Sequence, residues 1–576
     1  MRLVTTPISP WVGETNDVVY LGQWCRDQLG DSSAPLLIHT TPRATLSEKV
    51  QLTLLSNRIF EELFSDLVFK ANLLHGEIHD QRYWRIICGR WLMGFVDVVI
   101  QRWSLIDSAL ATYPITHSDG LLLDGSLRAP VLSQDYLLQL TSHEWNSALF
   151  GSILTFRGIE MEMQKVENIT RYTQLIRPPH TSSSLRLLYS FLARHSRVAI
   201  SESYFSRREE FLLGARLRSL PLLPNPCDMP AVTYDVSARE ELRLDDKVST
   251  HPVTSFIRRV LHEWLPFSVV ELHASLRRSA QSGSYPHSPR GIVTANKHHS
   301  DDRFMTWMAD QAEKGTPLIL AQHGGLYGES EIRTRHEEHE IQIADRYLTW
   351  GWHDSRYENI RAVPVQLPRR KARAASRAGE NLVIVLDATL RYSRHCWDTQ
   401  VESADYLLRI RDLVHRLEMP IRSKTIVRLH HAHTQLNADN RLIIGTIAPA
   451  QFDDGFTPMF QVLRDARIVV STTLGTTFGE AIQMRIPSLI LLDELVYPIR
   501  AESVNVFNQL KKNKIYSTDI NDLVETIGSL WDDPCRYWSD EARRTALKSY
   551  LQRHACHETQ RVKRWLRECK PTLNWK

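Results

Sequence analysis

Residues 469–487 read VVSTTLGTTFGEAIQMRIP and place five hydroxyl residues and two glycines between an apolar run and an amphipathic one. The run Ala466–Ser471 predicts a buried strand, and the helical pattern that includes Gly479–Met484 ends near Pro487. Residues 488–492 are apolar again. The stretch therefore predicts a strand–loop–helix–strand unit.

The loop of this unit is suited to bind an anion. Free backbone N–H groups at the helix start, around Thr476, carry partial positive charge that favours phosphate. The hydroxyls of Thr473, Thr476 and Thr477 would add donors. The alternative is that Ser471 and Thr472 only end the strand and that Thr476 only caps the helix, as hydroxyl residues often do.

The composition describes an ordinary soluble chain. Of 576 residues 43% are apolar and 24% charged, and the net charge of +4 gives no reason to expect a nucleic-acid partner. Because there is neither a secretion signal nor a run of about 18 apolar residues, we expect a cytoplasmic protein. The seven cysteines are scattered without a CxxC pair, and the histidines without an HExxH motif, so we expect no disulfide frame, no metal and no cofactor.

The chain divides into segments of different pattern. Short apolar runs at 2–6 and 17–22 predict strands, and residues 46–172 carry mainly helical periodicity. Strands and helices then alternate up to residue 364, and again over 380–540, which predicts an α/β fold with parallel sheets. Residues 541–576 predict terminal helices. The basic segment 365–379 is either a solvated linker or a contact for anionic lipid headgroups.

Residues 291–328 form a second candidate site, because two predicted strands end in polar residues at one sheet edge. His323 precedes two glycines, so an imidazole able to exchange protons sits on a backbone that can approach a ligand closely. Asp301 and Asp302 offer a carboxylate that could attack an anomeric carbon or act as a base. The alternatives are a helix cap for the aspartates and an ordinary loop histidine.

Other charged residues lie near the predicted strand ends. Arg391, Arg428 and His430 could neutralise a nucleotide phosphate, with structural ion pairing as the alternative for the arginines. The acidic run at 337–340 predicts a solvated helix face.

Several blocks together resemble a family of bacterial surface-carbohydrate transferases related to the retaining β-Kdo glycosyltransferases, Kdo being 3-deoxy-D-manno-oct-2-ulosonic acid. The blocks are LVTT (3–6), LGQWC (21–25), HGEIHDQRYWRIICGRWL (75–92), QHGGLYG (322–328), YLTWGW (347–352), LRYSR (390–394) and TTFGEAIQMRIP (476–487). The resemblance implies a GT-B-like architecture, in which two Rossmann-like domains face each other across a cleft. Residues 1–364 would form the catalytic and acceptor domain, with a large helical insertion at about 46–172, and 380–540 the nucleotide-binding domain.

The resemblance also implies roles for individual residues. Asp302 or Asp301 would attack the anomeric carbon to give an aspartyl glycosyl-enzyme, and His323 would be the acid/base. Thr476, Thr477 and Glu480 would contact the nucleotide. The chain departs from the family pattern at IHTTPR (38–43), where a Tyr-His-Trp-Asp block is expected, and at Met305, where a lysine is expected.

A CMP-ulosonic acid carries a phosphate and a carboxylate, so its site needs two anion contacts. The side chains available for the carboxylate or the acceptor are Arg82, Arg85, Lys297, His298, Arg303 and Gln322. We therefore expect a metal-independent, retaining glycosyltransferase that moves Kdo from CMP to a glycan or lipid-linked glycan of the bacterial surface at the inner membrane face. The alternatives are another nucleotide sugar on the same fold, or a non-catalytic carbohydrate-binding protein.

Overall fold

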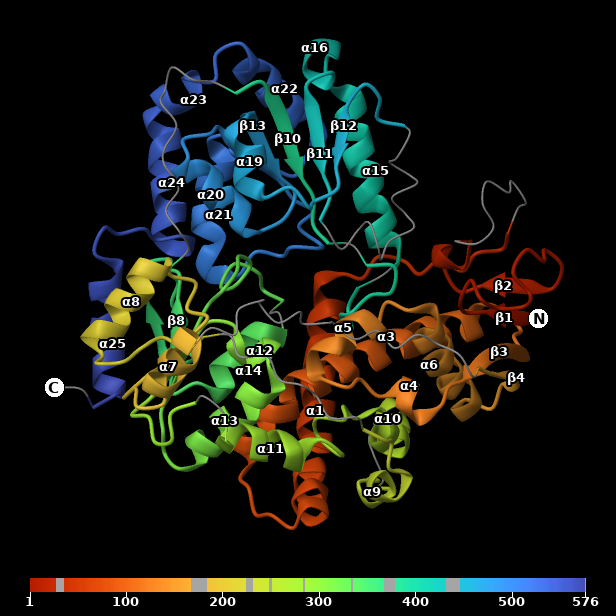
Figure 1. Ribbon diagram of the computed structural model, residues 1–576. Coiled ribbons are helices and arrows are strands. Elements are labelled where there is room, and N and C mark those ends of the chain that lie inside the picture. The colour runs from red at the N-terminus through yellow and green to blue at the C-terminus, as the bar shows by residue number, and fades with distance from the viewer. Residues whose placement is uncertain are drawn as a thin grey trace.

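The computed structural model describes residues 1–26, 36–166, 184–223, 232–247, 251–282, 285–332, 335–366, 379–388, 390–398, 400–430 and 446–574. Three sheets appear in this part of the chain, and every strand pair in them is parallel. An isolated antiparallel bridge outside the sheets joins Ser330 to Ile499. Figure 1 shows two lobes. The lower lobe holds the two sheets whose strands lie within residues 2–165 and 199–362, and the upper lobe holds the sheet whose strands lie within residues 381–517. The predicted α/β class is confirmed.

The first sheet has the order β2-β1-β3-β4. Its strands are β1 (Arg2–Val4), β2 (Val18–Tyr20), β3 (His117–Leu122) and β4 (Glu160–Lys165). The prediction of a helical insertion over 46–172 is wrong at β3 and β4. Their sequences, HSDGLL and EMEMQK, lack a continuous apolar run, and β4 is largely exposed.

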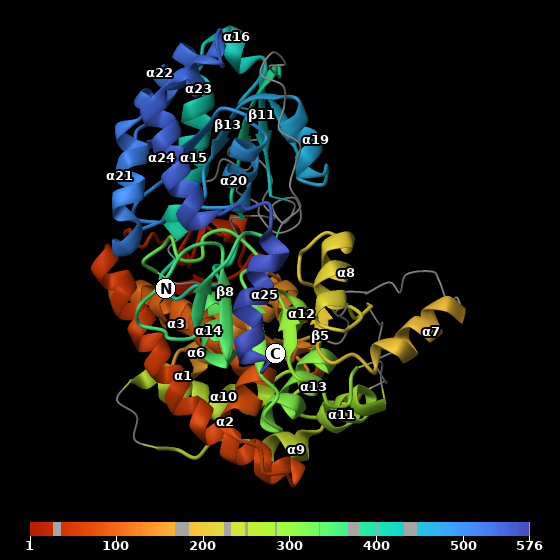
Figure 2. The ribbon, with the colours of Figure 1, turned by 90° about the vertical axis from the view of Figure 1, so that its left-hand side faces the viewer.

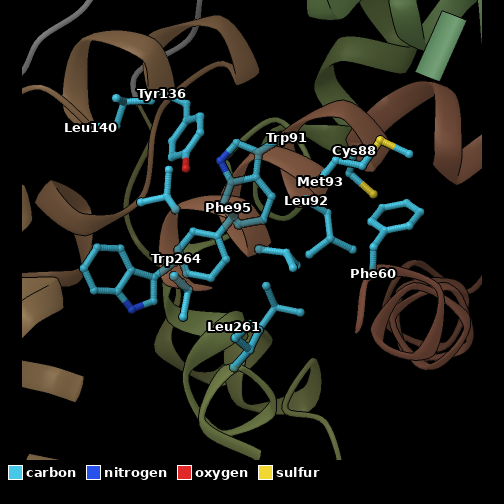
Figure 3. Packing of buried hydrophobic residues seen from close by; sticks show 14 of the residues in the cluster. Phe60, Cys88, Trp91, Leu92, Met93, Phe95, Tyr136, Leu140, Leu261 and Trp264 are labelled. Carbon is cyan, nitrogen blue, oxygen red and sulfur yellow. The ribbon is translucent and has the colours of Figure 1, made fainter. Parts of the chain in front are cut away.

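Helices between these strands supply most of the lower core. They are α1 (Leu46–His75), α2 (Gln81–Trp84), a π-helical turn (Arg85–Gly89), α3 (Arg90–Thr112), α4 (Gly125–Arg128), α5 (Tyr136–Gln139) and α6 (His143–Phe156). A capping box between Thr45 and Glu48 starts α1, and Gly76, with φ of 62°, ends it in the left-handed conformation. Figure 3 shows Trp91 and Phe95 of α3 packed among Tyr136 and Trp264.

The second sheet runs in chain order from β5 to β9. Its strands are β5 (Ala199–Ser201), β6 (Ile292–Thr294), β7 (Leu318–Ala321), β8 (Arg346–Thr349) and β9 (Ile360–Ala362). The helices of this region are α7 (Ser184–Ala193), α8 (Arg207–Arg216), α9 (Val236–Glu241), α10 (Pro252–Trp264), α11 (His273–Ser282), α12 (Lys297–Ser300), α13 (Asp302–Glu313) and α14 (Arg335–Ile343). One apolar core joins this sheet to the first one.

The third sheet has the order β12-β11-β10-β13-β14-β15. Its strands are β10 (Asn381–Val385), β11 (Thr425–Arg428), β12 (Gln451–Asp453), β13 (Ala466–Ser471), β14 (Ser488–Leu491) and β15 (Tyr516–Ser517). Numbered along the chain, this order is 3-2-1-4-5-6, that of a Rossmann domain. Strand order reverses between β10 and β13, and in such sheets ligands bind at the carboxyl ends of the strands beside that point.

The helices of the upper lobe cover both faces of the third sheet (Figure 1). They are α15 (Gln400–Arg416), α16 (Met419–Arg422), α19 (Met459–Arg464), α20 (Thr476–Gln483), α21 (Val504–Lys512), α22 (Ile520–Trp531), α23 (Arg536–Ser539) and α24 (Glu541–His554). The last helix, α25 (Arg561–Thr572), returns to the lower lobe, where Trp565 packs with residues of β5 to β8. Among the described residues, no helix has the length and apolarity needed to cross a membrane.

Candidate functional site

The loops that follow β7 and β13 lie in backbone contact with each other. A Cβ atom placed on Gly325 would lie 2.6 Å from the carbonyl carbon of Gly475 and 2.8 Å from the amide nitrogen of Thr476. Real Cβ atoms essentially never come so close to backbone atoms, so only glycine fits at position 325. The two loops predicted separately as sites therefore meet between the lobes.

The β13 loop leads into α20 without a side-chain cap. Gly475 is the N-cap residue, and within the described part of the chain no side chain makes a capping hydrogen bond there, while Thr476 is already the first helical residue. The alternative that Thr476 only caps the helix is thus excluded. The first turn of α20 carries no acidic residue. Thr473, Thr476, Thr477 and Glu480 are all partly exposed around this helix start, which has the polarity that an anion requires.

His323, in the β7 loop, lies against the buried carboxylate of Glu340. The side chain of His323 is 19% exposed and that of Glu340 is 0% exposed, and Nδ1 lies 3.4 Å from Oε1. Tyr347 donates a hydrogen bond to Oε2 of Glu340 at 2.7 Å, and Tyr327 donates one to Oε1 at 3.3 Å. His299 contacts the same Oε1 through Nε2. Glu340 is therefore the centre of a polar network whose exposed member is His323.

Burial shifts the proton affinities of this network. It raises the pKa of Glu340 to about 7 and lowers the pKa of His323, although the charge of Glu340 opposes the latter effect. Burial, followed by the charge of Arg90, lowers the pKa of His298 to about 3. A lowered pKa leaves the His323 imidazole neutral at neutral pH, the form that accepts a proton.

The same network contains atoms that could ligate a metal. Ligand atoms of His298, His299 and Glu340 lie within 4.8 Å of one another, and imidazole and carboxylate suit zinc. In the structure, Oε1 of Glu340 and Nε2 of His299 contact each other as hydrogen-bond partners. The absence of a metal remains our prediction for this site.

The two candidate nucleophiles lie in different surroundings. Asp301 caps α13 by accepting a hydrogen bond from the Phe304 amide at 3.0 Å, as the capping alternative proposed, and pairs with Lys297 at 3.0 Å. Asp302 is only 4% exposed and accepts bonds from the amide and hydroxyl of Ser133 at 3.1 and 2.8 Å. Burial raises the pKa of Asp302. An attacking carboxylate must be ionised, and burial opposes the ionisation of Asp302.

Comparison with known proteins assigns the family. The model of the LIC12162 family transferases matches residues 1–569, nearly the whole chain. The chain belongs to the LIC12162 transferase family. No curated protein matches it.

Two solved structures resemble the LIC12162-family chain at low TM-score. MurG of Acinetobacter baumannii has 10% identity and a TM-score of 0.30, over 64% of this chain and 97% of that one. The glycotransferase of kitacinnamycin has 11% identity and a TM-score of 0.32, over 67% of this chain and 94% of that one.

Arg82 and Arg85 of the transferase are engaged by protein groups. Arg82 donates to the carbonyl of Ile343 at 2.7 Å and to Asp345 at 2.6 Å. Arg85 pairs with Glu61 at 2.7 Å, and its guanidinium lies over the ring of Phe64. These contacts agree with the structural alternative, and the role as carboxylate ligands stays a prediction.

Gln322 and Arg428 also have structural partners. Gln322 is 1% exposed; its amide oxygen accepts bonds from the Trp350 amide and the Trp352 ring, and its amide group donates to the Gly324 carbonyl. Arg428 pairs with Asp453 at 2.7 Å and donates hydrogen bonds to two carbonyl groups of the loop that follows β12. Both side chains hold loops in place, and their contact with a ligand stays a prediction.

The other predicted site residues differ in burial and in their contacts. Lys297 lies between Asp301 and Glu202, and His298 is buried 3.6 Å from Glu340. Arg303 is 5% exposed with its guanidinium over the ring of Tyr285. On the upper side, Arg391 lies 3.3 Å from His143, and the partly exposed His430 follows β11. Of the predicted linker, residues 367–378 lie outside the described residues.

Sequence reasoning missed the role of α14. The acidic run predicted as a solvated face is buried, with Glu337 1% and Glu340 0% exposed. Glu337 pairs with Arg500 of the upper lobe at 2.7 Å and accepts a bond from the Gly328 amide at 3.0 Å. An arginine more than 160 positions away in the chain compensates this charge, and no local pattern could reveal it.

Proposed function

We propose that this transferase is a glycosyltransferase whose nucleotide-sugar donor lies between the β7 loop and the start of α20. One observation carries the proposal: Gly325 contacts the uncapped helix start beside the strand-order reversal of a Rossmann-type sheet. Phosphate groups bind at the free N-terminus of a helix, and the ligands of Rossmann-type sheets bind beside the reversal of strand order. His323, two residues from the contact, places a proton acceptor at the same junction.

The chemistry that we propose divides between the lobes. The donor phosphate rests on the first turn of α20, where partial positive charge stabilises the leaving nucleotide. Asp301 attacks the anomeric carbon and the bond to the nucleotide phosphate breaks, which gives a covalent sugar adduct. The acceptor hydroxyl then gives its proton to His323 and attacks the adduct, which frees the carboxylate and retains the configuration.

The donor that we propose is a CMP-ulosonic acid, with Kdo as first candidate. The support is the resemblance of the QHGGLYG and TTFGEAIQMRIP blocks to the β-Kdo transferases. Lys297, which lies between Asp301 and Glu202, is the cation that would bind the sugar carboxylate next to the proposed nucleophile. The acceptor is a glycan or lipid-linked glycan in the synthesis of bacterial surface polysaccharide, at the inner membrane face.

A second candidate is direct displacement from another nucleotide sugar. The observation that favours it is the state of the aspartates: Asp302 is buried with a raised pKa, and Asp301 is engaged by Lys297 and by the α13 amide. A mechanism without a covalent adduct does not require either carboxylate to attack.

A panel of nucleotides tests the proposed function. Thermal unfolding of the full chain is measured with CMP, UDP, GDP and dTDP; at a hundredfold excess over the dissociation constant, binding stabilises the native state by about 2.7 kcal/mol. We expect the largest rise in Tm with CMP. A larger rise with another nucleotide selects the second candidate, and no rise with any of them contradicts both.

A further inference from the structure

Helices α7 and α8 present a group of large apolar side chains to solvent. Leu188, Phe191 and Leu192 of α7 are 55%, 57% and 49% exposed, and Phe211 and Leu212 of α8 are 47% and 46% exposed. The two helices are neighbours, since the rings of Tyr189 and Phe211 meet edge to face at 6.4 Å. Figure 2 shows α7 standing away from the body of the lower lobe beside α8. We call these five residues the α7–α8 patch.

Exposed arginines accompany the apolar residues of the α7–α8 patch. Arg207 lies one helical turn before Phe211, and Arg208 and Arg216 lie one turn before and after Leu212, while Arg197 and Arg218 follow the two helices in the chain. Of the two acidic residues of α8, Glu209 pairs with Arg561 at 2.6 Å, and Glu210 accepts a hydrogen bond from the Ser203 hydroxyl at 2.7 Å. The patch therefore combines apolar side chains with neighbouring arginines, the combination found on protein surfaces that bind anionic membranes.

The turn that leads into α8 contacts the candidate site. Tyr204 lies in this turn, between β5 and α8, and is 38% exposed, and its ring stacks 6.4 Å from that of His323. The helix that carries Phe211 and Leu212 of the patch therefore starts next to a residue that contacts His323.

We propose that the α7–α8 patch docks on an anionic lipid bilayer, with the apolar side chains in the interface and the arginines on the headgroups. A second copy of the chain suits the patch less well, because the arginines beside two facing patches would repel each other. The docking itself does not depend on the proposed function. Only its consequence, the presentation of a lipid-linked acceptor to His323, rests on that function.

Cosedimentation with vesicles tests the docking. The full chain is mixed with vesicles of phosphatidylcholine alone, or with phosphatidylcholine and phosphatidylglycerol in about equal parts. We expect binding to the anionic vesicles, which added salt weakens. The double variant Phe191→Ser/Leu192→Ser should lower the partition coefficient at least about tenfold, since it replaces two of the five inserted apolar side chains by polar ones.

A matched control lies on α1, where Phe69 and Leu73 are 68% and 67% exposed. Phe69→Ser/Leu73→Ser should bind vesicles as the wild type does. Equal losses in both double variants, or no binding of the wild type, would overturn the proposal. A wild-type dimer in solution that becomes a monomer in Phe191→Ser/Leu192→Ser would also overturn it. The nucleotide-induced rise in Tm, measured without vesicles, should persist in Phe191→Ser/Leu192→Ser, which separates failure of docking from failure of the proposed function.

Discussion

Replacing His323 with alanine is expected to lower kcat about a hundredfold to ten-thousandfold, the usual contribution of a positioned acid/base group. The physical reason is the loss of the neutral imidazole that accepts the acceptor's proton at the junction of the loops. KM for the donor should change little, because His323 is not among the groups proposed to hold the phosphate. Steady-state transfer rates measure both constants. A rate within a few-fold of the wild type would remove His323 from the mechanism.

The companion variant Glu340→Gln separates a catalytic histidine from a structural one. The ionised fraction of Glu340 raises the pKa of His323, and Glu340→Gln removes this fraction, so the pKa of His323 falls further. Transfer by the wild type falls when pH drops below the pKa of His323, because the protonated imidazole cannot accept a proton. In Glu340→Gln this acid limb of the kcat profile should move to lower pH. An unmoved limb would show that His323 does not control it.

Replacing Gly325 with alanine is expected to lower kcat about a hundredfold, because small displacements of reacting groups have effects of this size. The added Cβ would meet the backbone of Gly475, Leu474 and Thr476 at 2.6 to 2.8 Å, and backbone atoms cannot rotate away as a side chain can. The β7 loop must therefore move from the start of α20, which separates His323 from the bound donor. We also expect a loss of stability of about 1 to 3 kcal/mol from overpacking.

Gly324→Ala is the matched control for that change. A Cβ on Gly324 would have no neighbour within 4 Å, although it stands next to Gly325 in the chain. This variant should transfer sugar at close to the wild-type rate and unfold at an unchanged temperature. Equal rates in the two alanine variants, whether both high or both low, would contradict the idea that the contact between the loops positions the reaction.

Local sequence patterns predicted the strands in which a continuous apolar run is followed directly by polar residues. The apolar run Ala466–Ser471 ends in hydroxyl residues and coincides with β13. By contrast, His117–Leu122 and Glu160–Lys165 mix polar and apolar residues, and their place in a sheet depends on pairing with β1 and with each other. Such pairing is a property of the folded chain, so these strands were missed.

The candidate site was predictable only in part. His323 and the start of α20 stand out locally, because glycines and hydroxyls follow apolar strands. The contact between Gly325 and Gly475 joins positions 150 apart, and the burial of Glu340 depends on Tyr327 and Tyr347. Sequence alone also cannot distinguish an arginine that binds a substrate from one that binds a carboxylate of its own fold, and the aspartate partners of Arg82 and Arg428 were not predicted.

Hydrogen–deuterium exchange with saturating nucleotide tests most directly whether the donor lies between the two loops. Amides that bind phosphate, or that are covered by the ligand, exchange more slowly. For the nucleotide that raises Tm most, we predict slower exchange in peptides that cover 322–328 and 471–480, in the same experiment and over the same concentration range. Protection confined to other segments, with both loops unchanged, would contradict the account.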